Sequence, residues 1–327
     1  MKGESKMYDN SLSIIIDTDP GVDDALAIMF AHRANMLAVR GITTVFGNQS
    51  IEKTTRNACT VVDIIGAEAL IYRGASRPLV KQAFCAESHG ETGLGGYWQN
   101  GELRNDKPLT QPVENANAVD FLAQTISMGT MIACIGPVTN LAILANLCPD
   151  VLRRVQSLIV MGGVFGEPGN TTPWAEFNVY CDPDAFAQLL AFSDVSKVLI
   201  PANICRTVTM DEDDFIGIQN QALSSAIKDI VSEYVAYYRG EHVYGGFAGG
   251  IMYDTLVIAY ILWPELFNTT PRHVVVETGN GSARGATVID RKRDNEPNCL
   301  LACPSNEKPL GVDAQEVKRR LLQLLSG

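Results

Sequence analysis

The chain has 327 residues, of which 46% are apolar and 19% are charged. This composition suits a large buried core and excludes an intrinsically disordered chain. The formal net charge of −11 argues against electrostatic binding to nucleic acids or anionic membranes, because such partners need a basic surface. The charge does not exclude a small nucleotide or nucleoside as ligand.

The sequence shows neither a membrane span nor the cysteine pattern of a secreted protein. No apolar run reaches ~18 residues, and the polar segment 1–10 lacks the apolar core of a signal peptide. The eight cysteines include no C-x-x-C pair, which is typical of reduced, buried thiols. We therefore expect a cytoplasmic protein with a flexible N-terminus at 1–10.

Short apolar runs alternate with helical patterns along most of the chain. In chain order, strands are predicted at 12–16, 37–45, 69–72, 130–135, 157–161, 197–200, 272–277 and 286–289. Helices are predicted at 24–32, 51–65, 118–128, 139–147, 184–192, 211–239, 254–262 and 313–325. This alternation predicts an α/β fold, with a mostly parallel open sheet and helices on both of its faces.

The chain is expected to form one domain over residues 1–327, because no linker and no internal repeat divides it. Two long segments, 74–116 and 162–180, are rich in Gly, Pro and polar residues and are predicted to be loops. Loops longer than ~12–15 residues usually carry function. We therefore expect an active site beside them, at the carboxyl ends of the strands.

Four carboxylates follow the first predicted strand within eight residues: Asp17, Asp19, Asp23 and Asp24. A Pro-Gly turn lies between the two pairs, which allows Asp19 and Asp24 to approach one point. Carboxylates held this close repel one another unless a cation lies among them. Hard oxygen ligands select Ca²⁺ or Mg²⁺ over zinc, so the cluster predicts a site for such an ion.

Other interpretations of the cluster account for less of it. A helix N-cap uses only one acid, and an EF-hand loop counted from Asp17 fails at Val22 and Ile28, where Gly and Glu are required. A magnesium-dependent phosphatase of the haloacid dehalogenase type begins with a strand and Asp-x-Asp, with Asp17 as nucleophile, but its continuation differs from this one. A non-catalytic module that binds calcium or ribose stays open as well.

The stretch Asp-Thr-Asp-Pro-Gly-Val-Asp-Asp-Ala at 17–25 closely resembles the signature of the inosine–uridine-preferring nucleoside hydrolase family. Five further stretches continue the resemblance in the family's order over most of the chain: Thr43–Asn48, His89–Gly95, Gly136–Asn140, Met161–Gly163 and Ala175–Asn178. The resemblance implies hydrolysis of the N-glycosidic bond of ribonucleosides to free base and ribose, in nucleoside salvage. It also implies Ca²⁺ as cofactor and a homodimer or homotetramer.

The resemblance further assigns roles to single residues. It implies that Asp19 binds the metal and accepts a proton from the attacking water, and that Asp24, the backbone carbonyl of Ile135 and the remote Asp254 complete the metal site. The positions implied to bind the sugar are Asp23, Asn48, Met161, Asn170, Glu176 and Asn178. Glu176 and Asn178 are two residues apart, so in an extended segment they face the same side.

Activation of the leaving base is the step at which this sequence departs from the family. Members have His or Trp just before the last calcium-binding aspartate, whereas this chain has Tyr253. A phenol could protonate the base, stack on it or form a passive wall. An aromatic side chain there favours purine over broad or pyrimidine preference, because a two-ring base gains more from stacking. The other residues expected to contact the substrate are His89, His242, Tyr244 and Phe247, the last three in a loop over the base.

Overall fold

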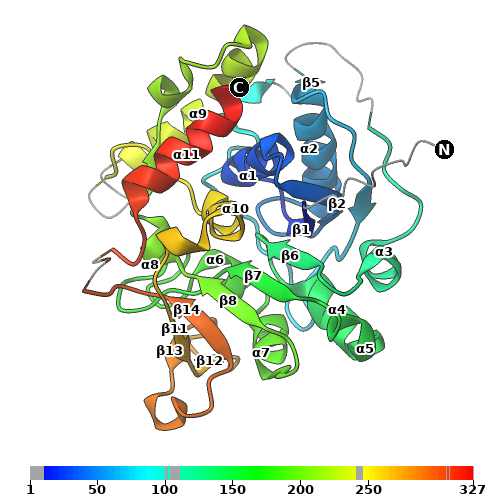
Figure 1. Ribbon diagram of the computed structural model, residues 1–327, viewed down its shortest axis with the longest axis vertical. Coiled ribbons are helices and arrows are strands. Elements are labelled where there is room, and N and C mark those ends of the chain that lie inside the picture. Colours follow the sequence, from blue (N-terminus) through cyan, green and yellow to red (C-terminus); the bar gives the residue numbers. More distant parts are fainter. Residues whose placement is uncertain are drawn as a thin grey trace, which may run out of the picture.

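The computed structural model describes residues 11–99, 102–103, 111–240, 246–306, 308 and 310–326. Its centre is an eight-stranded open sheet in the order β11-β14-β8-β7-β6-β1-β2-β3, with helices on both faces (Figure 1). Within this sheet β11 is antiparallel to β14, and the other neighbours run parallel. The strands are β1 (Leu12–Thr18), β2 (Leu37–Thr44), β3 (Ile71–Arg73), β6 (Met131–Cys134), β7 (Ser157–Met161), β8 (Lys197–Ile200), β11 (Thr269–Arg272) and β14 (Cys299–Ala302).

Helices cover the sheet and a few short strands lie outside it. The helices are α1 (Val22–Arg33), α2 (Ile51–Ile64), α3 (Ala118–Thr125), α4 (Thr139–Leu147), α5 (Pro149–Leu152), α6 (Phe177–Cys181), α7 (Pro183–Ala191), α8 (Ala202–Cys205), α9 (Gln221–Arg239), α10 (Thr255–Leu262) and α11 (Ala314–Ser326). The short pairs are β4 (Trp98–Gln99) with β5 (Glu102–Leu103), β9 (Thr209–Met210) with β10 (Gly250–Ile251), and β12 (Val274–Val276) with β13 (Thr287–Ile289).

Each face of the sheet has its own core, because successive side chains of a strand point to opposite faces. Ile14 and Ile16 of β1 are fully buried in a core with α1, α2, α10 and α11. Ile15, between them, belongs to the second core with α3, α4, α5 and α7. A strand buried on both faces has no polar alternation, and this explains the continuous apolar run at 14–16.

The strand order reverses beside β1. The chain passes from β1 to β2 and β3 on one side, and β6, β7 and β8 follow on the other. In open α/β sheets, ligands bind outside the carboxyl ends of the strands at such a point. Here Asp17 is the second-last residue of β1, and its carbonyl accepts a hydrogen bond from the amide of Ile135, just after β6, at 2.8 Å. The acid cluster therefore lies at the position where this topology places a site.

Some predicted elements differ from the structure. The strand predicted at 272–277 is divided between β11 and β12, and β14 was missed, because four residues without a β-branched side chain give a weak strand signal. The loop predicted at 162–180 contains most of α6. Among the described residues no helix is long and apolar enough to cross a membrane.

Candidate active site

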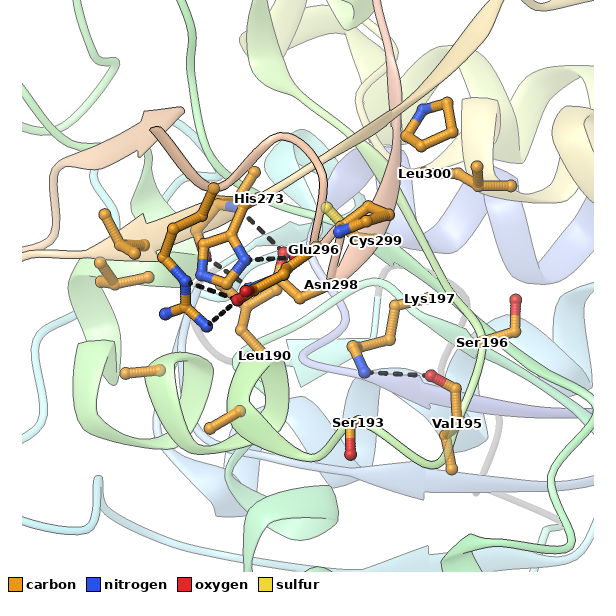
Figure 2. A pocket seen from close by; sticks show the side chains of 18 of the residues that line it. Leu190, Ser193, Val195, Ser196, Lys197, His273, Glu296, Asn298, Cys299 and Leu300 are labelled. Atoms are coloured by element: carbon orange, nitrogen blue, oxygen red, sulfur yellow. Dashed lines mark hydrogen bonds and ion pairs between the residues drawn. The ribbon is translucent and has the colours of Figure 1, made fainter. Parts of the chain in front are cut away.

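Two cavities stand out in the structure. The larger, of about 990 Å³, is a cleft at the amino-terminal ends of β8 and β14, lined in part by Lys197, His273 and Asn298 (Figure 2). The smaller, of about 290 Å³, lies at the carboxyl ends of the strands, beside the acid cluster. Volume alone would select the cleft as the active site. The two cavities differ, however, in whether their polar side chains are already hydrogen-bonded within the protein.

The polar side chains of the cleft are satisfied within the protein. Lys197 is buried, and its Nζ donates to the carbonyl oxygens of Phe192 at 2.6 Å and Val195 at 3.0 Å. Asn298 Nδ2 donates to the carbonyl oxygen of Val274 at 2.8 Å. His273 Nδ1 lies 2.6 Å from the carbonyl oxygen of Glu296. These groups close the ends of strands and loops, which is a structural role.

The smaller cavity brings together side chains from segments far apart in the sequence. It contains nearly all of the predicted substrate residues that the structure describes: Asp23, Asn48, His89, Met161, Asn170, Glu176 and Asn178. Ile135, Tyr253 and Asp254, predicted for metal binding or catalysis, also line it. Asp19 and Asp24 lie behind this lining and are fully buried.

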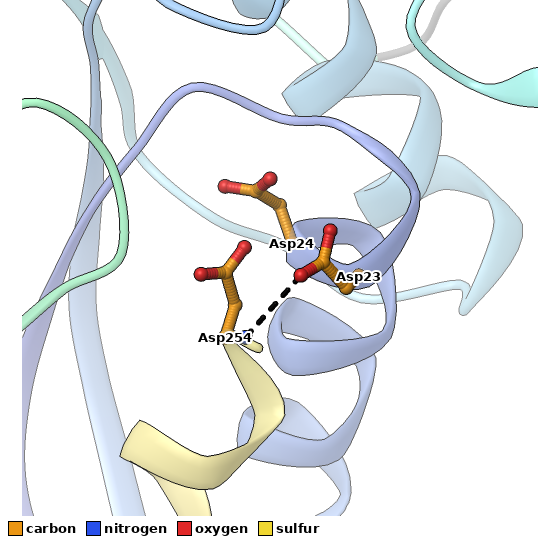
Figure 3. A group of neighbouring side chains, drawn as sticks. All are labelled: Asp23, Asp24 and Asp254. Atoms are coloured by element: carbon orange, nitrogen blue, oxygen red, sulfur yellow. Dashed lines mark hydrogen bonds between the residues drawn. The ribbon is translucent and has the colours of Figure 1, made fainter. Parts of the chain in front are cut away.

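Three aspartates, two of which line this cavity, converge on one another (Figure 3). Asp23, Asp24 and Asp254 are buried, and each has a carboxylate oxygen within 4.8 Å of one on the others. Asp23 and Asp24 lie in the first turn of α1, and Asp254 directly precedes α10. The two packed helices thus direct their amino-terminal ends at one point, where the helix dipole favours negative charge.

Asp19 adds a fourth carboxylate to this group, and one of its oxygens has no partner. Its Oδ2 accepts a hydrogen bond from the amide of Asn48 at 2.7 Å, but its buried Oδ1 has no partner among the described residues. Two glycines allow this approach, because a Cβ at Gly47 would lie 2.0 Å from Oδ2 and one at Gly136 would lie 2.5 Å from Oδ1. Buried polar oxygens are normally paired, so this one is suited to binding a cation or a water molecule.

Asp24 is held firmly in place by three donors. Its Oδ1 accepts from the Thr18 hydroxyl at 2.5 Å, and its Oδ2 accepts from the Gly21 amide at 2.9 Å and from Asn48 Nδ2 at 3.0 Å. Asn48 therefore bridges Asp19 and Asp24, in addition to lining the cavity. The carboxylates form one preorganised group.

The charge balance of this group is unfavourable without a cation. Burial raises the pKa of Asp19 well above its ordinary value, and the negative charges of Asp24 and Asp23 raise it further. Burial also raises the pKa of Asp254 well above its ordinary value. The negative charges of the neighbouring aspartates raise it further. Protons or a metal ion must neutralise such a site, and a set made only of oxygen donors fits a hard divalent ion.

Two of the predicted sugar-binding residues, Glu176 and Asn178, already form hydrogen bonds within the protein. Asn178 Nδ2 donates to the carbonyl oxygen of Ile135 at 3.2 Å and to that of Met161 at 3.3 Å. Glu176 is the N-cap of α6, and its carboxylate accepts from the amides of Asn178, Val179 and Gly163. The prediction that Glu176 and Asn178 lie in an extended segment was therefore wrong, because the capped helix begins between them.

His89 reaches the cavity from the long loop at 74–116. Its Nδ1 accepts a hydrogen bond from the amide of Val22 at 3.0 Å, and its ring stacks on Tyr234 with 5.1 Å between the centroids. Burial lowers the pKa of His89 to about 3, so the imidazole is neutral at physiological pH. Because Nδ1 accepts, Nε2 carries the proton.

Tyrosines form much of the remaining wall, and three of them were missed by the sequence analysis. Tyr234, Tyr237 and Tyr238 of α9 line the cavity. Their spacing of three and four residues on one helix face was the available signal. Tyr253 faces Tyr238 with 6.3 Å between ring centroids, and its buried hydroxyl, near the side chains of Tyr238 and Asn170, has no partner of good geometry among the described residues.

Of the side chains predicted to contact the base from the loop before β10, the structure describes only Phe247. Phe247 is outside the lining residues, and its ring packs against Tyr238 with 6.2 Å between centroids. His242 and Tyr244 lie outside the described residues. The expectation of a loop that closes over the base therefore stays a prediction for these two side chains.

The phosphatase interpretation does not survive the structure. Asp17, its required nucleophile, is fully buried and does not line the cavity. Its Oδ1 accepts hydrogen bonds from the Thr43 hydroxyl at 2.5 Å and from Asn140 Nδ2 at 2.8 Å. These two bonds tie Asp17 to β2 and α4, whereas Asp23 and Asp254 are the aspartates that line the cavity.

Known proteins resemble this chain over nearly its whole length. The profile of the family described as inosine-uridine preferring nucleoside hydrolase matches residues 14–318. Pyrimidine-specific ribonucleoside hydrolase RihA from Shigella boydii serotype 4 is 34% identical over 301 residues, which cover 89% of this chain and 93% of that protein. RihA from Escherichia coli O8 gives the same identity and coverage.

Solved structures agree with the sequence relatives. The purine-preferring ribonucleoside hydrolase from Gardnerella vaginalis superimposes with a TM-score of 0.84 at 26% identity, covering 96% of this chain and 98% of that one. The plant nucleoside hydrolase PpNRh1 gives a TM-score of 0.80 at 25% identity, with 96% and 99% covered. The relatives thus share the fold and differ in the base named in their descriptions.

Proposed function

Because this chain belongs to the inosine-uridine preferring nucleoside hydrolase family and is therefore a ribonucleoside hydrolase that cleaves N-glycosyl bonds, we propose that it uses Ca²⁺ and prefers purine nucleosides. The observation that carries the metal proposal is the convergence of the buried carboxylates of Asp23, Asp24 and Asp254 next to Asp19, one oxygen of which has no partner among the described residues. Such a group is stable only when its charge is neutralised. Its all-oxygen donor set suits Ca²⁺ better than softer metals.

The metal ligands in this proposal are Asp19, Asp24, Asp254 and the carbonyl oxygen of Ile135. When bound, the ion supplies acidity to a water molecule and two contacts for vicinal hydroxyl groups. Asp19 is the general base, because its Oδ1 is the free oxygen of the cluster. Asp23, Asn48, Asn170 and Asn178 orient the ribose, since their amides and carboxylates pair with hydroxyl groups.

Tyr253 is proposed to donate a hydrogen bond to the leaving base. Burial raises its pKa above the ordinary value, so the phenol keeps its proton at neutral pH. Its hydroxyl is buried in the cavity wall without a partner of good geometry among the described residues. A bound base with a ring nitrogen or carbonyl in reach satisfies that donor, which assists departure.

The preference for purines rests on the aromatic wall. Tyr234, Tyr237, Tyr238 and Tyr253 line one cavity, and a two-ring base offers more stacking surface to such a wall than a one-ring base. Pyrimidine preference is the second candidate, because the relatives at 34% identity are named pyrimidine-specific. A dimeric or tetrameric state and a cytoplasmic location stay predictions from the sequence.

An assay with five nucleosides tests both parts of the proposal. Release of reducing sugar is measured with inosine, guanosine, adenosine, uridine and cytidine, before and after chelation with EDTA. We expect kcat/KM to be highest for a purine nucleoside, turnover to disappear with EDTA, and Ca²⁺ to restore it better than Zn²⁺. A higher kcat/KM for uridine or cytidine overturns the purine preference, and full activity in EDTA overturns the metal site.

A further inference from the structure

Two cysteines that are far apart in the sequence lie near each other, next to residues that line the active-site cavity. Cys181 ends α6, whose Phe177 and Asn178 line the cavity. Cys85 lies in the segment 84–89, where the neighbouring residues on both sides, through His89, line the same cavity. The two thiols therefore belong to two facing parts of one wall.

The contact between these parts is direct. The Cys181 thiol donates to the carbonyl oxygen of Phe84, with 3.9 Å between sulfur and oxygen. A planar trans peptide places the Cα of the next residue about 2.8 Å from a carbonyl oxygen. The sulfur of Cys181 therefore lies within roughly 7 Å of the Cα of Cys85. This upper limit is the sum of the sulfur–oxygen distance and the distance from that oxygen to the next Cα in a standard peptide.

The two thiols differ in accessibility. Cys181 is buried, whereas Cys85 is exposed on an irregular segment. Burial raises the pKa of the Cys181 thiol well above its ordinary value, and the nearby Asp19, Glu176 and Cys85 add to that rise. An oxidant from solvent therefore meets Cys85 first, and Cys181 stays a protected thiol beside it.

We propose that Cys85 and Cys181 form a reversible disulfide that fastens the segment 84–89 to α6 and thereby inhibits the enzyme. Disulfides need Cα atoms roughly 4.4–6.8 Å apart, so the bond requires the irregular segment that holds the exposed Cys85 to move toward α6. Because α6 is fixed by the Glu176 cap, the segment with His89 is the part that moves.

The chemistry requires a peroxide as the oxidant. The Cys85 thiolate attacks one peroxide oxygen and becomes a sulfenic acid, and the other oxygen leaves as water. Cys181 then loses its proton and attacks the sulfenic sulfur, and the hydroxide released takes up a proton to form a second water. The two thiols lose two electrons in total, and one peroxide is reduced to two waters. A dithiol such as dithiothreitol reverses the bond by exchange.

Closure of this bond is expected to slow turnover. The ring of Phe84 packs on Phe177 and Tyr180 in the reduced protein, at 6.2 and 5.7 Å between centroids. Movement of Cys85 toward α6 displaces Phe84 and shifts His89, which lies four residues after Cys85 in the same segment. A misplacement of about 1 Å in a positioning group can cost ~10²-fold in rate, so kcat/KM should fall at least tenfold.

Hydrogen peroxide treatment of the full-length enzyme tests the proposal. Wild type and the variants Cys85→Ser, Cys181→Ala and Cys148→Ser are digested without reductant, and the linked peptide is sought by mass spectrometry. In parallel, inosine and uridine turnover are followed before and after dithiothreitol. Cys148 is the matched control, because it is only partly buried and lies in the connection before α5.

We expect wild type and Cys148→Ser to form the 85–181 linked peptide and to lose activity that dithiothreitol restores, whereas Cys85→Ser keeps its activity. Absence of the linked peptide in wild type, or equal inactivation of Cys85→Ser, overturns the proposal. Because Cys85 is exposed, its serine variant should fold normally even if Cys181→Ala does not. The linked peptide is detected by mass, so failure of this proposal is distinguishable from an error in the assigned substrate.

Discussion

The large cleft and the small cavity both contain buried ionisable groups, yet only one of them is built for chemistry. In the cleft, Lys197 and Asn298 donate to backbone carbonyls, and none of the described lining residues has a buried side-chain nitrogen or oxygen without a partner. At the small cavity, Asp19 Oδ1 has no partner among the described residues, and the Tyr253 hydroxyl has none of good geometry. Converging buried carboxylates together with unmet polar groups, rather than volume, therefore distinguish the active site from the cleft.

Asp19→Asn should have the largest effect. The amide keeps the shape of the side chain but cannot accept the proton of water, so kcat should fall ~10²–10⁴-fold while KM changes little. Glu296→Gln in the cleft is the matched control. Its kcat should stay within about twofold of wild type, since Glu296 forms only an exposed ion pair with Arg293. Steady-state kinetics with inosine and uridine check both. A loss in Glu296→Gln as large as that in Asp19→Asn would remove the distinction between the two cavities.

The stability of the metal-free protein should depend on pH because of carboxyls near the small cavity. Burial raises the pKa of Asp17 to about 6 and that of Glu176 to about 7. A carboxyl whose pKa is higher in the folded state binds more protons when folded, so its stabilisation is present at low pH and is lost as the pH rises through the folded pKa. Between pH 5 and 8 the free energy of unfolding should fall by ~2–4 kcal/mol, given ~1.4 kcal/mol per pKa unit.

Urea unfolding in EDTA at pH 5, 6, 7 and 8 measures this slope. Glu176→Gln should flatten it, because the group no longer titrates, whereas the cleft variant Glu296→Gln should leave it unchanged. Added Ca²⁺ should stabilise the protein more at pH 8 than at pH 5, since protons compete with the metal for carboxylates. Stability that rises between pH 5 and 8 in EDTA would contradict the assigned direction of these shifts.

Tyr253→Phe tests the second unpaired group. Loss of the hydroxyl should lower kcat for inosine by ~10–10²-fold, the lower part of the range for general acids. It should have little effect on 4-nitrophenyl riboside, whose leaving group needs no proton. Tyr260→Phe in α10 is the matched control, because Tyr260 packs against Phe267 away from the cavity. An equal loss on both substrates would make Tyr253 a packing residue.

Arg206→Gln should have the smallest effect on turnover. The guanidinium, almost buried, donates to Glu167 Oε2 and to the carbonyl oxygen of Pro168, both at 2.8 Å. Burial raises the pKa of Glu176 and of Tyr253, and the positive charge of Arg206 opposes both rises. We expect a loss of roughly tenfold or less in kcat/KM, with partial rescue in Arg206→Lys. No rescue by lysine would show that the two hydrogen bonds of the planar guanidinium matter more than its positive charge.

The sequence alone was sufficient to predict the α/β class, the mostly parallel open sheet and most of its elements. Helix α4 and strands β7 and β8 have the predicted bounds. The acid cluster was also visible, because its four members lie within eight residues on the two sides of one Pro-Gly turn. These features depend on periodicity and on neighbours in the chain, which a sequence displays directly.

Only the tertiary structure decided which remote groups meet at the site. Asp254 approaches Asp23 and Asp24 because α10 packs beside α1, more than 200 residues earlier. The α9 tyrosines and the Cys181 contact with Phe84 arise in the same way. No local pattern encodes such contacts, because they depend on how buried faces of separate elements pack together. For the same reason, β14 became a strand only through pairing with β8 and β11.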